Sequence, residues 1–197
     1  MRRYTLPLAA VLVLASSAAH AQNLITNGDF NAGLTGWSNS AGNVSTHTIG
    51  GAFGEVVEVG VGDFNTSLFQ SFTLAAPSAL GISFNLGVYR DTLNGFGVSS
   101  GPWIMGISLE DSGATTVWSS TADAFNATQS GIYTPELSIS KATTALPAGT
   151  YTLRFTSPTG HGWTILDNIS VTAAPEPGTL VLLGLGGLCL ARRRRPR

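Results

Sequence analysis

The sequence predicts an all-β protein, a sandwich or barrel built from short antiparallel strands. Apolar and polar residues alternate with a period of two in several stretches, which is the pattern of a strand with one buried face. No long window shows the apolar spacing near 3.6 that an amphipathic helix requires. Glycine is frequent, with 24 residues in a chain of 197, and Gly, Asn, Asp, Ser and Pro separate the alternating stretches. This pattern favours about eight to ten short strands.

The alternation is clearest in GISFNLGVY, where Ile82, Phe84, Leu86 and Val88 share the face that we expect to be buried. A hairpin is expected where WIMGISLEDSGATTVWS turns at Glu110-Asp111-Ser112-Gly113. Besides the two arms of this hairpin, strands are expected at 44–49, 55–59, 67–74, 81–89, 137–140, 149–157 and 163–172. Long loops are expected at 90–102 and 120–131.

The stretches SLFQSFTL and GTYTLRFTS alternate in the same way. Their apolar positions predict the rest of the core. The residues expected inside are Leu68, Phe72, Leu74, Tyr151, Leu153 and Phe155.

The first 21 residues have the three parts of a secretory signal. Met1-Arg2-Arg3 is basic, residues 6–19 are apolar, and Ala19-His20-Ala21 carries small residues at the positions that signal peptidase reads. We therefore expect a signal helix that is cleaved after Ala21. The alternative is an N-terminal helix buried in the fold.

The C-terminal stretch APEPGTLVLLGLGGLCLARRRRPR combines a polar motif, an apolar run and a basic end. A stable membrane span needs roughly 20 apolar residues, and the run 178–191 is shorter and rich in glycine. The arginines behind it resist translocation and favour the cytoplasmic side. The tail therefore predicts a short hydrophobic helix that tethers the exported chain transiently to the inner membrane. The alternative is an ordinary single-pass tail anchor.

This tail resembles the PEP-CTERM sorting signal of Gram-negative bacteria, in which Pro175-Glu176-Pro177 is the sorting motif. The resemblance implies processing by an exosortase and delivery to the cell surface or the extracellular matrix. It divides the chain into a signal peptide at 1–21, a globular domain at 22–174 and a sorting tail at 175–197.

The charge of the domain at 22–174 limits its partners. Its basic residues are Arg90, Lys141 and Arg154 alone, against ten acidic residues, which gives a net charge of −7. Such a domain is a poor nucleic-acid binder, because affinity there depends on neutralising phosphates. A neutral sugar or a cation is compatible with this charge. The one cysteine, Cys189, lies in the tail, so the domain has no disulfide and no thiolate ligand available.

Catalytic patterns are weak, and we expect no enzyme activity. Glu55 and Glu58 should point to opposite faces of one strand, and Glu110 and Asp111 are expected in a turn, so neither pair suits glycoside hydrolysis.

Both ends of the domain resemble the CenC-like carbohydrate-binding modules, which are galactose-binding-like folds. NLITNGDFNAGLTGW resembles their opening, and AGTYTLRF followed by ILDNISVT resembles their last two strands. The resemblance implies a jelly-roll β-sandwich of two antiparallel sheets whose first and last stretches pair. It also implies a non-catalytic polysaccharide-binding module. The alternative is a structural exopolymer or biofilm-associated protein without a discrete ligand site.

Some members of this fold hold a structural calcium ion between the opening loop and the last strand. Calcium prefers several oxygen ligands, and the resemblance implies Asp29, Asn31 and Asp167 as side-chain ligands, with a carbonyl near Gly28 and one of Glu55 or Glu58. The alternative is that Asp29 and Asp167 cap turns by accepting hydrogen bonds from backbone amides.

Exposed aromatic residues are the usual platforms for sugar rings. Tyr89, Arg90, Trp103 and Trp118 are the candidates for such a carbohydrate-binding cluster. The alternative is that these aromatic side chains pack in the core or in loops. Trp37 and Trp163 are expected in the core.

Overall fold

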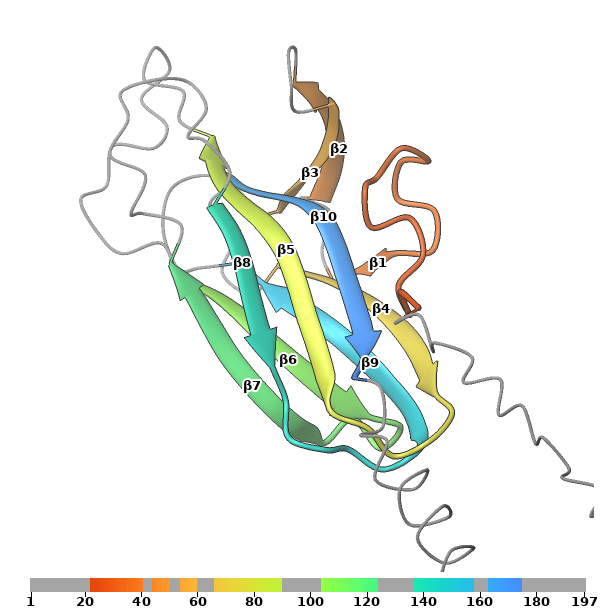
Figure 1. Cartoon of the computed structure of the whole chain (residues 1–197). Coiled ribbons are helices and arrows are strands. Elements are labelled where there is room, and N and C mark those ends of the chain that lie inside the picture. The colour runs from red at the N-terminus through yellow and green to blue at the C-terminus, as the bar shows by residue number, and fades with distance from the viewer. Residues whose placement is uncertain are drawn as a thin grey trace, which may run out of the picture.

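A computed structural model describes residues 22–40, 44–49, 54–59, 66–89, 104–123, 137–157 and 163–174. In these ranges all regular structure is strand, arranged as two antiparallel five-stranded sheets that stack as a sandwich (Figure 1). The expected all-β, two-sheet architecture is therefore confirmed. The signal helix at 1–21 and the hydrophobic helix of the tail lie outside the described residues. No helix in the described ranges meets the length and apolarity that a membrane span requires.

Strands that are distant in sequence lie side by side in both sheets. The first sheet has the order β1-β4-β9-β6-β7, and the second has the order β2-β3-β10-β5-β8. We call them sheet I and sheet II. The strands of sheet I are β1 (Ser38–Asn39), β4 (Ser67–Leu74), β9 (Gly149–Thr156), β6 (Ile104–Asp111) and β7 (Thr116–Asp123). The strands of sheet II are β2 (Val44–Ile49), β3 (Gly54–Val59), β10 (Trp163–Ala173), β5 (Leu80–Tyr89) and β8 (Leu137–Ala142).

The hairpin of β6 and β7 differs from the expectation in two ways. β6 continues through Glu110 and Asp111, so the turn lies two residues later than predicted, at residues 112–115. The Asp111 carboxylate causes this shift, because it accepts hydrogen bonds from the amides of Gly113 (2.9 Å) and Thr115 (2.9 Å). β7 then runs to Asp123, so the loop predicted from residue 120 was wrong at its start. The two-residue strand β1 was not predicted.

The core lies between the sheets and is built from the faces that the alternation predicted. Phe84 of β5 and Phe155 of β9 meet across the sandwich with ring centroids 5.1 Å apart and ring planes at 74°. This edge-to-face contact is a favoured aromatic geometry. The other predicted residues that the structure shows buried in this core are Leu68, Phe72, Leu74, Ile82, Leu86, Tyr151 and Leu153.

The opening stretch pairs with the last strand, as the resemblance implied. The Leu24 amide donates to the Val171 carbonyl (2.7 Å), and the Ile169 amide donates to the Gly28 carbonyl (2.9 Å). Beyond Gly28 the chain makes turns, which place the Phe30 and Trp37 rings in the core with centroids 5.5 Å apart. The core position expected for Trp37 is therefore confirmed.

Candidate functional site

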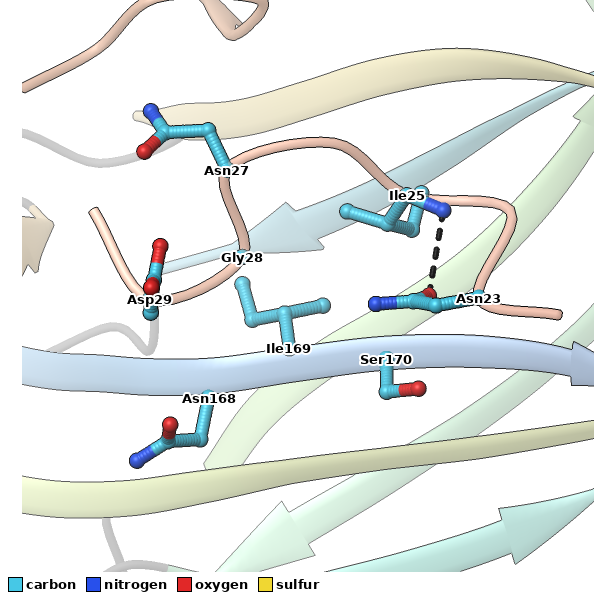
Figure 2. A pocket seen from close by; sticks show the side chains of 8 residues that line it. All are labelled: Asn23, Ile25, Asn27, Gly28, Asp29, Asn168, Ile169 and Ser170. Carbon is cyan, nitrogen blue, oxygen red and sulfur yellow. Dashed lines mark hydrogen bonds between the residues drawn. The ribbon is translucent and has the colours of Figure 1, made fainter. Parts of the chain in front are cut away.

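A depression of about 360 Å³ lies between the opening turn and β10. Figure 2 shows the opening turn running along β10, with Ile169 directed toward Ile25 and Asn168 directed to the other side of the strand. The residues that line it are Asn23, Ile25, Asn27, Gly28, Asp29, Asn168, Ile169 and Ser170. This is the place where the resemblance implied calcium.

Asn27 holds the opening turn in shape. Its side-chain amide donates to the carbonyls of Gly33 (2.8 Å) and Thr35 (3.0 Å), and its Oδ1 accepts from the Ala32 amide (3.0 Å). Its own carbonyl accepts from the Trp37 indole nitrogen (2.9 Å). The side chain of Asn27 is therefore a structural part of the turn.

The predicted calcium ligands make hydrogen bonds with their neighbours. Asp29 is exposed, and its Oδ2 accepts from the Asn31 side-chain amide (2.6 Å). Asp167 is only 5% exposed, and its two carboxylate oxygens accept from the backbone amide and the side-chain amide of Asn168 (both 2.7 Å). The Gly28 carbonyl already accepts from the Ile169 amide.

These contacts bear on the fit of an ion. In the described part of the chain, no three His, Cys, Asp or Glu side chains come together as a metal-binding group. Of the two further candidates, Glu55 accepts from Thr48 on the neighbouring strand (3.4 Å), and the side chain of Glu58 lies outside the described atoms. The hydrogen bonds of Asp167 are of the kind that the capping alternative requires. Calcium binding stays a prediction.

Asp167→Ala distinguishes capping from calcium binding. From its two hydrogen bonds we expect a loss of about 1–3 kcal/mol in the free energy of unfolding, because burial makes an unmade polar contact costly. Thermal melting with calcium and with a chelator should show the same loss.

If Asp167 instead binds calcium, the wild-type protein gains about 2.7 kcal/mol at an ion concentration near 100 Kd, and the variant does not. Asp29→Ala is the matched control. It should change the free energy of unfolding by less than about 0.5 kcal/mol under the capping alternative, since the carboxylate is exposed. A melting temperature that rises with calcium in the wild type alone would contradict the capping alternative.

The structure separates Trp118 from Tyr89, two members of the predicted carbohydrate-binding cluster. Trp118 is paired with Leu109 and its side chain packs, half-buried, against the core, so the packing alternative holds for this residue. Tyr89 ends β5 in sheet II, whereas Trp118 lies near the start of β7 in sheet I. Those two strand ends lie at opposite ends of the sandwich (Figure 1). Arg90, Trp103 and the sorting motif Pro175-Glu176-Pro177 lie outside the described residues, as do the side chains of Tyr89 and Trp163.

The outer face of sheet I instead carries many hydroxyl groups. The inward side chains of β4, β9 and β6 fill the core, so the alternate positions of these strands face outward. The strand registers place these outward residues in rows, such as Ser71 beside Thr152, whose hydroxyls are 2.9 Å apart. The hydroxyl residues of this face are Ser67, Ser71, Thr73, Ser108, Ser119, Thr121, Thr150, Thr152 and Thr156.

Arg154 organises the centre of this face. Its Nε and Nη2 donate to the two carboxylate oxygens of Glu110 (2.8 and 3.0 Å), and its Nη1 donates to Ser67 Oγ (3.0 Å). The guanidinium also stacks on the Phe69 ring, with the Cζ atom 4.4 Å from the centroid. This arrangement pairs both carboxylate oxygens of Glu110 with the guanidinium, which also covers one side of the aromatic ring.

Beside this cluster lies an open depression of about 600 Å³. Gly106 stands at an outward position of β6 where any other residue would place a side chain, next to Thr121 and Thr156 on the flanking strands. Residues lining the depression are Gly106, Ile107, Ser108, Thr116, Ser119, Ser120, Thr121 and Thr156. Hydroxyls both donate and accept hydrogen bonds and carry no charge, so the surface suits a neutral ligand that is itself rich in hydroxyls.

Sequence reasoning missed this surface because it searched for aromatic and charged residues. The signal was present in the serine and threonine residues that alternate with the apolar residues of 67–74 and 149–157. Only the strand order shows that these residues share one face.

Comparison with known proteins gives a match at the C-terminus and several for the fold. Residues 173–195 match the PEP-CTERM protein-sorting motif. The chain carries this motif, as the sequence predicted. No curated protein matches the chain.

Solved structures of several proteins resemble the sandwich. A CBM4 structure is 12% identical, with 76% of this chain and 99% of that chain covered and a TM-score of 0.53. The CBM22-1 xylan-binding domain from Paenibacillus barcinonensis Xyn10C is 13% identical, with 80% and 97% covered and a TM-score of 0.53. The fold is that of the carbohydrate-binding-module jelly rolls. The enzymatically active domain of tailspike protein 4 from bacteriophage CBA120 is 12% identical, with a TM-score of 0.53. The similarity covers 77% of this chain and 21% of the tailspike chain.

Proposed function

We propose that this chain is an exported, exosortase-processed protein of the cell surface or extracellular matrix, and that its sandwich is a non-catalytic polysaccharide-binding module. The observation that carries the binding proposal is the hydroxyl-lined depression at Gly106 on the outer face of sheet I. It supports binding of a neutral glycan, because a flat row of hydroxyl donors and acceptors matches a chain of sugar hydroxyls.

The export proposal rests on the two ends of the chain. The signal at 1–21 directs translocation, and the matched sorting motif supports processing by an exosortase. In this proposal residues 22–174 form the exported domain, and the apolar run of the tail holds it at the inner membrane until cleavage near Pro175-Glu176-Pro177.

Deleting residues 192–197 should prevent correct processing, because the arginines keep the end of the tail on the cytoplasmic side. We expect the intact mass of the wild-type surface protein to lack both 1–21 and Cys189, and the deletion variant to be lost from the surface. Replacing the five arginines by lysine keeps the charge and should preserve processing. Surface protein that retains Cys189 at full yield would contradict the proposal.

Gly106→Leu tests the binding face. A Cβ at residue 106 would meet its nearest neighbour, Thr156 Cβ, at 3.5 Å, which is an ordinary contact, so the variant should fold and fill the depression. Soluble xylan oligosaccharides are the first probes, because a neighbour of the same fold is a xylan-binding domain. We expect saturable calorimetric binding to the wild type and a loss of about tenfold or more in the variant, equivalent to about 1.4 kcal/mol.

Ser83→Leu is the matched control, since it adds the same side chain on the exposed face of sheet II. If Ser83→Leu loses glycan binding and Gly106→Leu keeps it, the binding site does not lie at Gly106. If neither xylan nor other neutral polysaccharides bind saturably, the structural exopolymer-associated role becomes the better proposal.

A further inference from the structure

β7 is an edge strand with unusually little protection against pairing. It ends sheet I, and no strand in the described part of the chain pairs with its outer side. Unpaired edge groups recruit further strands unless Lys, Pro, short length or a bulge prevents it. From Thr116 to Ala122 the strand has no charged residue, proline or glycine, and its bulge, at Val117, lies near its start.

Two of the other three edges carry such protection, since β1 has two residues and β8 carries Lys141, whereas β2 is six residues long with polar residues throughout 45–48. By contrast, the exposed large apolar side chains among the described residues are Ile104 (44% exposed) and Val117 (40%), and both belong to the β6–β7 hairpin.

We infer that β7 pairs antiparallel with β7 of a second copy of this chain, joining two copies of sheet I into one continuous sheet. A bulge interrupts the ladder between β6 and β7 at Leu109/Glu110. From Trp118 to the end of β7 the ladder is regular. A two-fold pairing that uses this regular stretch is centred on Ser120. It places Ser119 opposite Thr121 of the partner.

This register fits the chemistry of the strand. Residues that lie opposite each other in an antiparallel pair have their side chains on the same side of the sheet. When the numbers of two opposed residues of β7 sum to an even value, as 119 and 121 do, inward residues lie opposite inward residues. The large Trp118 then faces the small Ala122 of the other copy, and the hydroxyls of Ser119 and Thr121 face each other. Asp123, the one charge on β7, lies opposite Val117, so no like charges meet.

The pairing also extends the hydroxyl surface. Ser119, Ser120 and Thr121 form one wall of the depression at Gly106. In the pair, the two depressions lie on either side of the shared strands and form one longer face. This last consequence rests on the proposed function, whereas the pairing itself does not.

Analytical ultracentrifugation of the protein, purified in the form that its host exports, tests the pairing. We expect a dimer. Ser119→Lys/Thr121→Lys should raise the dissociation constant by about tenfold or more, because it sets like charges directly opposite. Ser71→Lys/Thr73→Lys is the matched control on β4, with the same residue types, spacing and outward face, and should remain dimeric. Mixing the lysine variant with Ser119→Glu/Thr121→Glu should restore the dimer.

Ser120→Cys gives a second readout that does not depend on the charged variants folding. Because Ser120 faces itself across the two-fold axis, mild oxidation should yield a covalent dimer, whereas Ser71→Cys should not. A monomeric wild type overturns the inference. A dimer that the lysine variant leaves intact, or equal cross-linking at residues 71 and 120, also overturns it.

Discussion

Phe84→Ala should lower the free energy of unfolding by about 3–5 kcal/mol, the usual cost of emptying a buried aromatic site. Phe84 is 2% exposed in the middle of β5 and packs edge-to-face on Phe155 of the opposite sheet. Its removal therefore leaves a cavity between the two layers. Denaturant unfolding followed by tryptophan fluorescence measures the loss.

Ser83→Ala provides the comparison, since Ser83 is the exposed neighbour on the same strand. It should change the free energy of unfolding by less than about 0.5 kcal/mol. If the two substitutions cost the same, Phe84 does not occupy the core and the assignment of the inner face of sheet II is wrong.

Gly28→Ala should cost about 3 kcal/mol, because the opening turn lies too close to β10 to admit a side chain. A Cβ at residue 28 would collide with the carbonyl oxygen of Ile169, so the backbone must move. That movement also breaks the hydrogen bond from the Ile169 amide to the Gly28 carbonyl. The same unfolding measurement applies, and hydrogen exchange at Ile169 should become faster.

Gly33→Ala separates crowding from backbone conformation. Gly33 has a φ of +60°, and a Cβ there would approach nothing closer than Thr46 Oγ1 at 4.0 Å. Its substitution should cost only the left-handed conformation, about 1–2 kcal/mol. An equal or smaller cost at Gly28 would show that the first and last stretches are not in close contact.

The hairpin turn shows why element boundaries were harder to predict than the strands. The run Glu110-Asp111-Ser112-Gly113 has the composition of a turn, but composition alone does not say which residue begins it. Asp111 Oδ1 accepts from two amides further along the chain, which keeps Asp111 at the end of β6. β1 was missed for a related reason, since two residues are too short to show a period.

Two residues of β4 break the alternation that otherwise describes the strand. Gln70 takes an inward position and Phe69 an outward one. Gln70 is accommodated because its side-chain oxygen accepts from the Thr26 amide (2.8 Å) and its nitrogen donates to the Thr26 carbonyl (3.0 Å). Phe69 is accommodated because Arg154 of β9 covers its ring. Both partners come from distant parts of the chain, so no local pattern reveals them.

The sequence by itself determined most of the strands, most of their inward faces and the C-terminal sorting motif, because each is a property of one short stretch. Alternation records which side of a strand is buried, whatever its neighbours are. The tertiary structure alone decided that β9 lies between β4 and β6, while β10 lies between β3 and β5. That order depends on contacts between segments that are distant in the chain. Bringing such segments together costs conformational entropy, and only the burial of the complete core offsets this cost. It brings Ser67, Glu110 and Arg154 together and leaves the space beside Gly106 open, and thereby creates the candidate binding face.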